Sequence, residues 1–407
     1  MIFRFRRQLS LWLALSMLSI VLSGCWDQLE IEDRALVLGL AIDQAPEDSQ
    51  PKSDQVTHIK DNLNLPMIRV TAQIAVPGRV PLGPSNGESG GSGGSQNPVW
   101  VVQVYGYTLD DAMNNLQQQI SDPRYLIHLR VLIISEEIAR TNLGDLNDYL
   151  RRNPEVRRRT WMLVSEGEAS QFMDVNPPLQ RVPTLYILSM MEKAVESGKF
   201  PADYIGVFWS SESKWGENGF LPYISRRNKE NILIKGLAYF SGGKMVGATV
   251  PIEIGAFMAM KGMDPGGYSI LFKSVTYGPV MIMVNKRFSR IKVHIVDGKP
   301  QITYHIALDT GLDEHVNNNV SVNSTQKLED LEGEFRKGAL KIFQSVIDQT
   351  RQKQSDIFGL GEHVRAHAPA FWNSRIHSKS DWEQLYSSLT IHLDVDVAIR
   401  RVGLKER

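Results

Sequence analysis

Cysteine is almost absent from this sequence, since Cys25 is the only one among 407 residues. A single thiol excludes a disulfide within the chain, and it excludes metal sites built from two or four cysteines. The fold must therefore be held by its hydrophobic core. A chain of this length is long enough to bury one, and it predicts two or three domains.

Catalytic motifs are also missing. The patterns GxSxG, HExxH, GxxxxGK[ST] and CxxC do not occur, which argues against the hydrolase, metalloprotease and nucleotide-binding classes that they mark. Neither sign of charge is in excess, because 45 basic residues balance 45 acidic ones. After the first 24 residues, no segment is apolar enough to span a membrane.

The N-terminal segment, by contrast, is typical of an export signal. Arginines within residues 1–7 give it a positive start, and Leu9–Leu22 is an apolar run of the length expected for a signal peptide. The small residues Ser23 and Gly24 then precede Cys25. This arrangement resembles a bacterial lipobox, in which the thiol receives a diacylglyceryl group and the chain is cut before the cysteine. The alternative is an ordinary secretory signal with an incidental cysteine.

The lipobox predicts a signal peptide at residues 1–24 and a mature chain that begins at Cys25. The signal removes three arginines and no acids, so the mature chain has 42 basic and 45 acidic residues, a formal charge of −3. Two acyl chains anchor a protein stably, whereas one binds only marginally. We therefore expect an exported globular body, lipid-anchored to the outer face of the cell membrane. We expect no cofactor apart from covalent lipid on Cys25, a diacylglycerol with or without an N-acyl chain.

Residues 25–180 predict a mixed α/β domain, because segments with strand periodicity alternate with amphipathic helices. Thr108 is the expected N-cap of the first helix. The Gly/Ser-rich stretch at residues 83–97 cannot bury apolar surface and is expected to be a flexible, exposed loop. The expected strands are 35–42, 68–76, 99–105, 126–134 and 160–164, and the expected helices are 108–120 and 143–150.

Two further domains are expected. Residues 181–268 predict a small middle domain, and residues 269–407 predict a C-terminal α+β domain. The fold class is therefore α+β or mixed α/β, with three domains that each hold a mixed or antiparallel sheet flanked by helices. In these two domains the expected helices are 184–196, 326–354 and one around Trp382, and the expected strands are 232–240, 245–250, 271–284, 290–296, 301–308 and 389–399.

Arginine is concentrated between residues 151 and 159, a stretch that includes Arg157, Arg158 and Arg159. Nucleic acid is not expected as a partner, because the chain is expected to be exported. Anionic lipid headgroups and an acidic protein partner remain as candidate ligands. The alternative is a solvated helix end and loop, since basic residues suit a helix C-terminus.

The stretch SDIFGLGE, residues 355–362, combines Asp356, Phe358 and Glu362 with two glycines. Glycines at such a place imply backbone geometry that a side chain would forbid. One interpretation is a tight connection between two helices. The other is a loop that docks on another protein.

Two weaker candidates lie nearby. His363 and His367 are four residues apart and could share a helix face, as metal ligands do. The glycines and proline around them argue against a regular helix, and no third ligand is signalled, so we expect no metal site. Asp394 and Asp396 alternate with apolar residues on the last expected strand, which indicates the solvated face of a half-buried strand rather than a catalytic pair.

A family resemblance joins these features. The stretch Gly24–Asp43, GCWDQLEIEDRALVLGLAID, closely resembles the start of the mature C subunit of spore germinant receptors, the Ger(x)C lipoproteins. Further stretches match in the same order: IHLRVLIISEEIA, LRRNPEVRRRTWMLVSEGEA, KGLAYFSGGKMVGATVPIE and QSDIFGLGEHVRAHAPAFW. A lipobox alone is shared by many lipoproteins, but the pattern CWDxxEIxxxAxVxGxxxD combined with SDIFGxGE is specific. The Gly/Ser-rich stretch has no counterpart in this pattern.

The resemblance implies a peripheral lipoprotein on the outer face of the inner spore membrane. It implies two integral-membrane partner subunits, of the A and B types, in a receptor that triggers germination when nutrients are sensed. It also implies three mixed α/β domains and no enzymatic activity. On this view Cys25 is the lipidation site. The candidate partner-binding residues are Trp26, Asp27, Arg157, Arg158, Arg159, Asp356, Phe358 and Glu362.

Three functional hypotheses follow. The leading one is a non-enzymatic assembly and signalling subunit of a nutrient germinant receptor. The alternative is a small-molecule-binding lipoprotein that itself recognises a nutrient, although such proteins usually have two similar lobes and the two halves of this chain differ. A cell-envelope hydrolase has only scattered carboxylates in its favour.

Overall fold

The computed structural model describes residues 12, 16, 34–46, 66–76, 97–141, 143–175, 177, 180–228, 230–315 and 324–402. The expected lipidation site Cys25, the adjacent Trp26 and Asp27, and residues 83–96 of the Gly/Ser-rich stretch lie outside the described residues. Among the helices in the described ranges, none combines the length and the apolar character needed to cross a bilayer.

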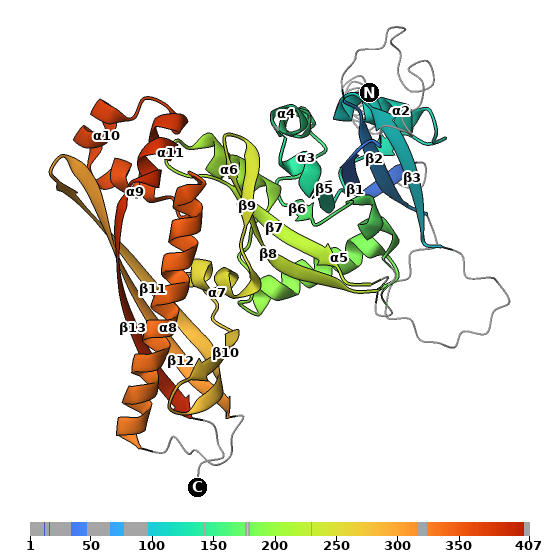
Figure 1. Cartoon of the computed structure of the whole chain (residues 1–407). Helices are drawn as coiled ribbons and strands as arrows, with labels where there is room; N and C mark the ends of the chain where they lie inside the picture. Colours follow the sequence, from blue (N-terminus) through green and yellow to red (C-terminus); the bar gives the residue numbers. More distant parts are fainter. Residues whose placement is uncertain are drawn as a thin grey trace, which may run out of the picture.

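The larger of the two sheets in Figure 1 has the strand order β3-β2-β1-β5-β6-β7-β8-β9, with the short β4 paired to β1. Strands β1, β5, β6 and β7 run parallel, and the outer pairs are antiparallel. The strands are β1 (Ala35–Gln44), β2 (Ile68–Ala75), β3 (Val99–Gly106), β4 (Arg124–Tyr125), β5 (Val131–Ser135), β6 (Trp161–Ser165), β7 (Phe220–Arg226), β8 (Ile232–Ser241) and β9 (Lys244–Ala248).

Helices cover both faces of this sheet, which explains why its central strands are apolar throughout. On β5, Val131 and Ile133 belong to the core that includes α5, whereas Leu132 and Ile134 belong to the core that includes α2 and α4. Thr108 caps α2 as expected, because its hydroxyl accepts from the N–H of Asp111 at 3.1 Å. The helices are α2 (Leu109–Gln117), α3 (Glu136–Ala139), α4 (Gly144–Arg152), α5 (Pro183–Glu196) and α6 (Ile205–Ser213), with a 3₁₀ helix at Ser170–Asp174.

The hairpin that was expected in a separate middle domain extends this same sheet. β7 pairs in parallel with β6 through Val164 and Tyr223, and β8 and β9 follow in antiparallel order. The described chain thus has one sheet where the sequence predicted two. Sequence periodicity is a local signal and does not predict which strands pair. The pairing of β6 with β7 joins two strands that α5 and α6 separate in the sequence. The mixed α+β, multidomain class is confirmed, and the domain boundaries at residues 180 and 268 stay predictions.

The second sheet has the order β10-β11-β12-β13 and is covered on one face by the long helix α8. The prediction of a single strand at residues 271–284 is wrong. A turn divides it into β10 and β11, and the N–H of Tyr277 closes this turn on the hydroxyl of Ser274 at 2.9 Å. The turn contains the β-branched Val275 and Thr276, which favour strands in a sequence pattern. The elements are β10 (Tyr268–Ser274), β11 (Gly278–Val296), β12 (Lys299–His315), α8 (Thr325–Gln352) and β13 (Thr390–Val402).

Helix α7 (Pro251–Met260) connects the two sheets. All of its residues from Glu253 to Met260 are buried, as expected for a helix that is apolar on every side. It contacts β8 of the first sheet and both α8 and β11 of the second part. Leu237, Phe257 and Tyr304 consequently belong to one continuous core. Three short helices pack beyond the end of α8, namely α9 (Leu360–His367), α10 (Pro369–Arg375) and α11 (Lys379–Ser387).

Candidate functional site

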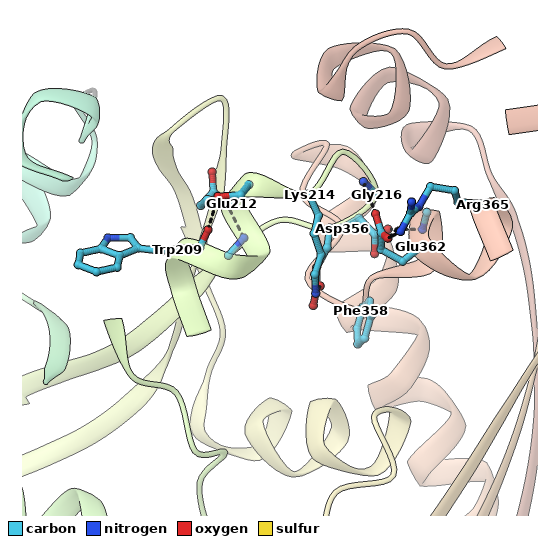
Figure 2. Close-up of polar contacts among 12 residues, drawn as sticks. Trp209, Glu212, Lys214, Gly216, Asp356, Phe358, Glu362 and Arg365 are labelled. Carbon is cyan, nitrogen blue, oxygen red and sulfur yellow. Dashed lines mark hydrogen bonds and ion pairs between the residues drawn. The ribbon is translucent and has the colours of Figure 1, made fainter. Parts of the chain in front are cut away.

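Residues 355–362 form the end of the connection after α8 and the first turn of α9, where the C-terminal part of the chain meets the first sheet. Ser355, Asp356, Phe358 and Leu360 in this loop are buried. The hydroxyl of Ser355 donates to the carbonyl oxygen of Phe240 on β8 at 2.5 Å. The loop therefore docks on the chain's own first sheet, and Figure 2 shows Asp356 and Glu362 beside the segment that contains Gly216.

Asp356 and Asn218 form a reciprocal pair of hydrogen bonds across this junction. The N–H of Asp356 donates to Oδ1 of Asn218, and the N–H of Asn218 donates to the carbonyl oxygen of Asp356, both at 2.8 Å. Nδ2 of Asn218 also donates to Oε1 of Glu383 on α11 at 2.6 Å. Because all three residues are buried, each hydrogen bond replaces one to water that folding removes.

The carboxylate of Asp356 holds the loop in its compact form. Its Oδ2 accepts from the N–H of Gly361 at 2.9 Å and from Nε1 of Trp382 at 3.0 Å. Among the described residues, its Oδ1 has no hydrogen-bond partner. Burial raises the pKa of Asp356 to about 6, although these hydrogen bonds act to lower it, and the negative charge of Glu217 raises it further. The junction therefore contains an acid that titrates in a mildly acidic range.

The glycines of the loop are required by geometry, as the sequence predicted. Gly359 has a φ of 73° and directly precedes α9, in the left-handed region that favours glycine. A Cβ on Gly361 would lie 2.6 Å from the indole of Trp382 and would also overlap the backbone of Gly216. Gly216 and Gly361 thus allow the two backbones to touch.

A rim of charged side chains surrounds this buried centre (Figure 2). Oε1 of Glu362 accepts from the N–H of Gly216 at 3.1 Å, and its other oxygen pairs with Arg365 at 2.6 Å. Glu217, the residue after Gly216, pairs with Lys214 at 2.6 Å and with Lys261 at 3.6 Å. The charges on this rim are matched within the chain.

These contacts correct the interpretation of the loop as a surface for another protein. Asp356 is 0% exposed and Phe358 is 1% exposed. The ring of Phe358 lies between Phe257 of α7 and Tyr304 of β12, with ring centres 5.7 and 6.4 Å away. Both side chains therefore hold the two parts of this chain together. Only Glu362 keeps part of its side chain in solvent.

Sequence reasoning missed Asn218 and Glu383, which complete the junction. Asn218 lies in the sequence GENGF, which reads as a turn, and its partner Asp356 lies 138 residues further along the chain. It also missed the buried Asp203, whose pKa is raised well above its ordinary value by burial and by the charge of Glu217. No local pattern signals either role, because each depends on a contact between distant segments.

The structure places the arginine cluster elsewhere, in the loop between α4 and β6. Arg157, Arg158 and Arg159 are exposed. The carbonyl oxygen of Arg158 accepts from the N–H of Gly206 on α6 at 3.0 Å, and the guanidinium of Arg159 lies 5.4 Å from the ring centre of Tyr204. The cluster and the junction are therefore two separate features.

The structure also corrects the expectation of an irregular backbone at His363 and His367. Both lie within the regular helix α9, because Gly359 stands just before the helix and the following proline begins α10. Their rings stack with centres 6.2 Å apart. In the described part of the chain, no group of three or more His, Cys, Asp or Glu side chains is arranged to hold a metal ion. Asp394 lies exposed on β13 and pairs with His305 at 2.8 Å.

A hollow of about 1000 Å³ lies between α2 and α4. Charged and polar side chains line its wall, among them Asp110, Arg124, Tyr149 and Arg152. Burial raises the pKa of Tyr149. This volume is at the upper end of the range for small-molecule sites.

Comparisons with known proteins agree over the length of the chain. A family model described as the spore germination protein N-terminal domain matches residues 27–226, and one described as spore germination B3/GerAC like, C-terminal, matches residues 235–403. The chain is 25% identical to spore germination protein B3 of Bacillus subtilis (strain 168) over 400 residues, 94% of this chain and 95% of that one. It is also 25% identical to spore germination protein YndF of the same organism over 418 residues, 98% of each chain. The crystal structure of the GerBC protein aligns with a TM-score of 0.51 at 18% identity, covering 84% of this chain and 96% of that chain, which shows a similar fold.

Proposed function

Because the chain belongs to the GerAC-like family of spore germination proteins, we propose that it is the lipoprotein subunit of a nutrient germinant receptor. In this role it is anchored by Cys25 to the outer face of the inner spore membrane. It works there with two integral-membrane subunits of the A and B types, as a non-enzymatic assembly and signalling component.

The observation that carries this proposal is the position of the family match relative to the lipobox. The match begins at residue 27, two residues after Cys25, and reaches residue 403 with a short interval. The sequence thus places a lipobox-like segment directly before the matches to both the N-terminal and the C-terminal germination domains. Trp26 and Asp27 directly follow Cys25 at the start of this body, where they would hold it close to membrane partners.

The polar side chains at the junction bind other groups of the same chain, which supports a non-enzymatic role. Asp356 and Asn218 are buried, and their side chains bind backbone and side-chain groups of the same chain. Glu362 binds Gly216 and Arg365. These contacts build a stiff connection between the two sheets, which suits a subunit that transmits contacts between partners.

Replacing Cys25 by alanine tests the anchor. We expect the protein to move from the membrane fraction to the soluble fraction, and nutrient-triggered germination to fall sharply, because the two acyl chains that hold it are lost. Membrane fractionation and the loss of spore refractility measure the two effects. The variant is exported through a secretory signal without a lipobox, and Ser23→Ala in the natural signal serves as a control that keeps the cysteine. Germination at the normal rate without the lipid would contradict the proposal.

The hollow between α2 and α4 favours one alternative, a lipoprotein that itself binds the nutrient. Its wall offers Arg124 and Arg152 to a carboxylate, and Asp110 to an ammonium group. Titration calorimetry of the full chain with a panel of amino acids and sugars tests this alternative. Saturable heat that disappears in an Arg124→Gln variant would support direct recognition, whereas no heat for any nutrient would argue against it.

A further inference from the structure

The topology brings the exposed arginines to one edge of the first sheet. Strands β1, β5 and β6 are parallel, so their N-terminal ends lie at the same edge. The N–H of Arg130, directly before β5, donates to the carbonyl oxygen of Leu38 on β1 at 2.9 Å. The carbonyl oxygen of Arg130 in turn accepts from the N–H of Trp161 at the start of β6, also at 2.9 Å. The loop that holds Arg157, Arg158 and Arg159 therefore meets Arg130 at this edge.

We refer to Arg130, Arg157, Arg158 and Arg159 as the arginine edge. All four side chains are exposed, and none forms an ion pair with an acidic side chain in the described ranges. Burial lowers the pKa of the nearby His128, and the positive charges of Arg130 and Arg157 lower it further. The charges of two separate segments therefore converge on one place, in a chain whose overall charge is balanced.

The anchored end of the chain leaves from this same edge. β1 begins at Ala35, whose N–H donates to the carbonyl oxygen of Pro123 at 3.1 Å and which pairs with Arg124. Ala35 comes only ten positions after Cys25 in the sequence. Ten residues span at most about 35 Å when fully extended. A lipid on Cys25 would therefore keep the arginine edge, rather than the far end of α8, close to the bilayer.

We propose that the arginine edge rests on anionic phospholipid headgroups of the membrane that holds the anchor. This inference rests on the proposed lipidation of Cys25. Each basic residue close to an anionic bilayer favours the docked state by a factor of about five. Four such residues at the tethered edge would fix which face of the body points to the membrane, and so which faces remain for protein partners.

A quenching experiment on the full-length lipidated chain in vesicles tests the orientation. Because lipid occupies the only natural thiol, a single introduced cysteine can carry a fluorophore. Val207→Cys places the label on α6 beside the arginine edge, where Val207 is 43% exposed, and Phe288→Cys places it on the second sheet, where Phe288 is 59% exposed. With a quencher on the lipid headgroups, we expect strong quenching at residue 207 in vesicles containing phosphatidylglycerol. Little quenching is expected at residue 288, or at residue 207 in pure phosphatidylcholine.

Charge variants test the arginines themselves. We expect the combined change Arg157→Gln, Arg158→Gln and Arg159→Gln to lower the ratio of docked to undocked protein by about a hundredfold. The matched control, Lys273→Gln, Arg290→Gln and Lys292→Gln, removes three exposed charges from the second sheet and should leave quenching at residue 207 unchanged. Equal quenching at both labels, or quenching that appears only after the integral-membrane subunits are added, would overturn the lipid proposal in favour of a protein partner. Failure of the unlabelled chain to float with vesicles of either kind would instead overturn the anchor on which it rests.

Discussion

Replacing Asn218 by alanine is expected to destabilise the protein by about 3–5 kcal/mol. The amide of Asn218 accepts from the buried N–H of Asp356 and donates to the buried carboxylate of Glu383. Alanine removes the amide that serves both groups, so the buried N–H of Asp356 loses its acceptor. The carboxylate of Glu383 loses its 2.6 Å hydrogen bond and keeps the longer one from the N–H of Gly242 at 3.3 Å. An unpaired buried group costs about 1–3 kcal/mol, and a charged one costs more.

Urea denaturation followed through tryptophan fluorescence measures this loss, because Trp382 lies in the same junction and is fully buried. Asn114→Ala is the matched control, since Asn114 lies exposed on α2 and its replacement should change the free energy of unfolding by less than about 0.5 kcal/mol. If the Asn218 variant lost no more than the control, the junction would not depend on this side chain, and the compactness of residues 355–362 would have to come from packing alone.

The local elements show how far the sequence alone can be interpreted. The strand at residues 68–76 and the helix capped by Thr108 were predicted within a few residues of β2 and α2, because alternation and capping are local signals. Helix α7 was not predicted. Its sequence PIEIGAFMAM is apolar on all sides, so it shows no helical periodicity even though it lies at the centre of the molecule.

In the candidate site too, local features could be predicted from the sequence, whereas contacts between distant segments could not. The glycines of SDIFGLGE correctly indicated a constrained backbone, because Gly359 needs a positive φ and Gly361 touches Gly216. Which surface the loop meets could not be predicted, since its partner segment around Asn218 lies far away in the sequence and reads as a turn. The arginine run was visible at once, but its proximity to Arg130 depends on the parallel pairing of β5 and β6.

The pH dependence of stability offers a second test, centred on Asp356. Burial raises its pKa to about 6 from an ordinary value of 3.8. At pH values between 3.8 and about 6, Asp356 keeps its proton in the folded protein but has released it in the unfolded chain. The stabilising contribution of this group is therefore complete below about pH 4 and is lost as the pH rises through about 6. A shift of this size corresponds to about 3 kcal/mol.

Asp356→Asn should abolish this dependence, because the amide oxygen can still accept from the N–H of Gly361 and the indole of Trp382 but has no proton to lose. We expect the free energy of unfolding of the natural protein, minus that of the variant, to fall by about 3 kcal/mol between pH 4 and pH 7. Urea titrations at intermediate pH values measure this difference. Asp203, whose pKa is also raised, is present in both proteins, so its contribution cancels. Asp313→Asn, on an exposed position of β12, controls for the loss of one negative charge.

The direction in which this free-energy difference changes with pH shows whether Asp356 is protonated or charged when the loop is folded. A difference that falls with rising pH means that burial dominates, so that the junction tightens when Asp356 takes up a proton and loosens when the proton leaves. A difference that rises instead would mean that the two hydrogen bonds to Oδ2 keep the carboxylate charged in the folded state. The unpartnered Oδ1 and the neighbouring negative charge of Glu217 both favour the first outcome, since neither helps to stabilise a charged carboxylate in a buried site.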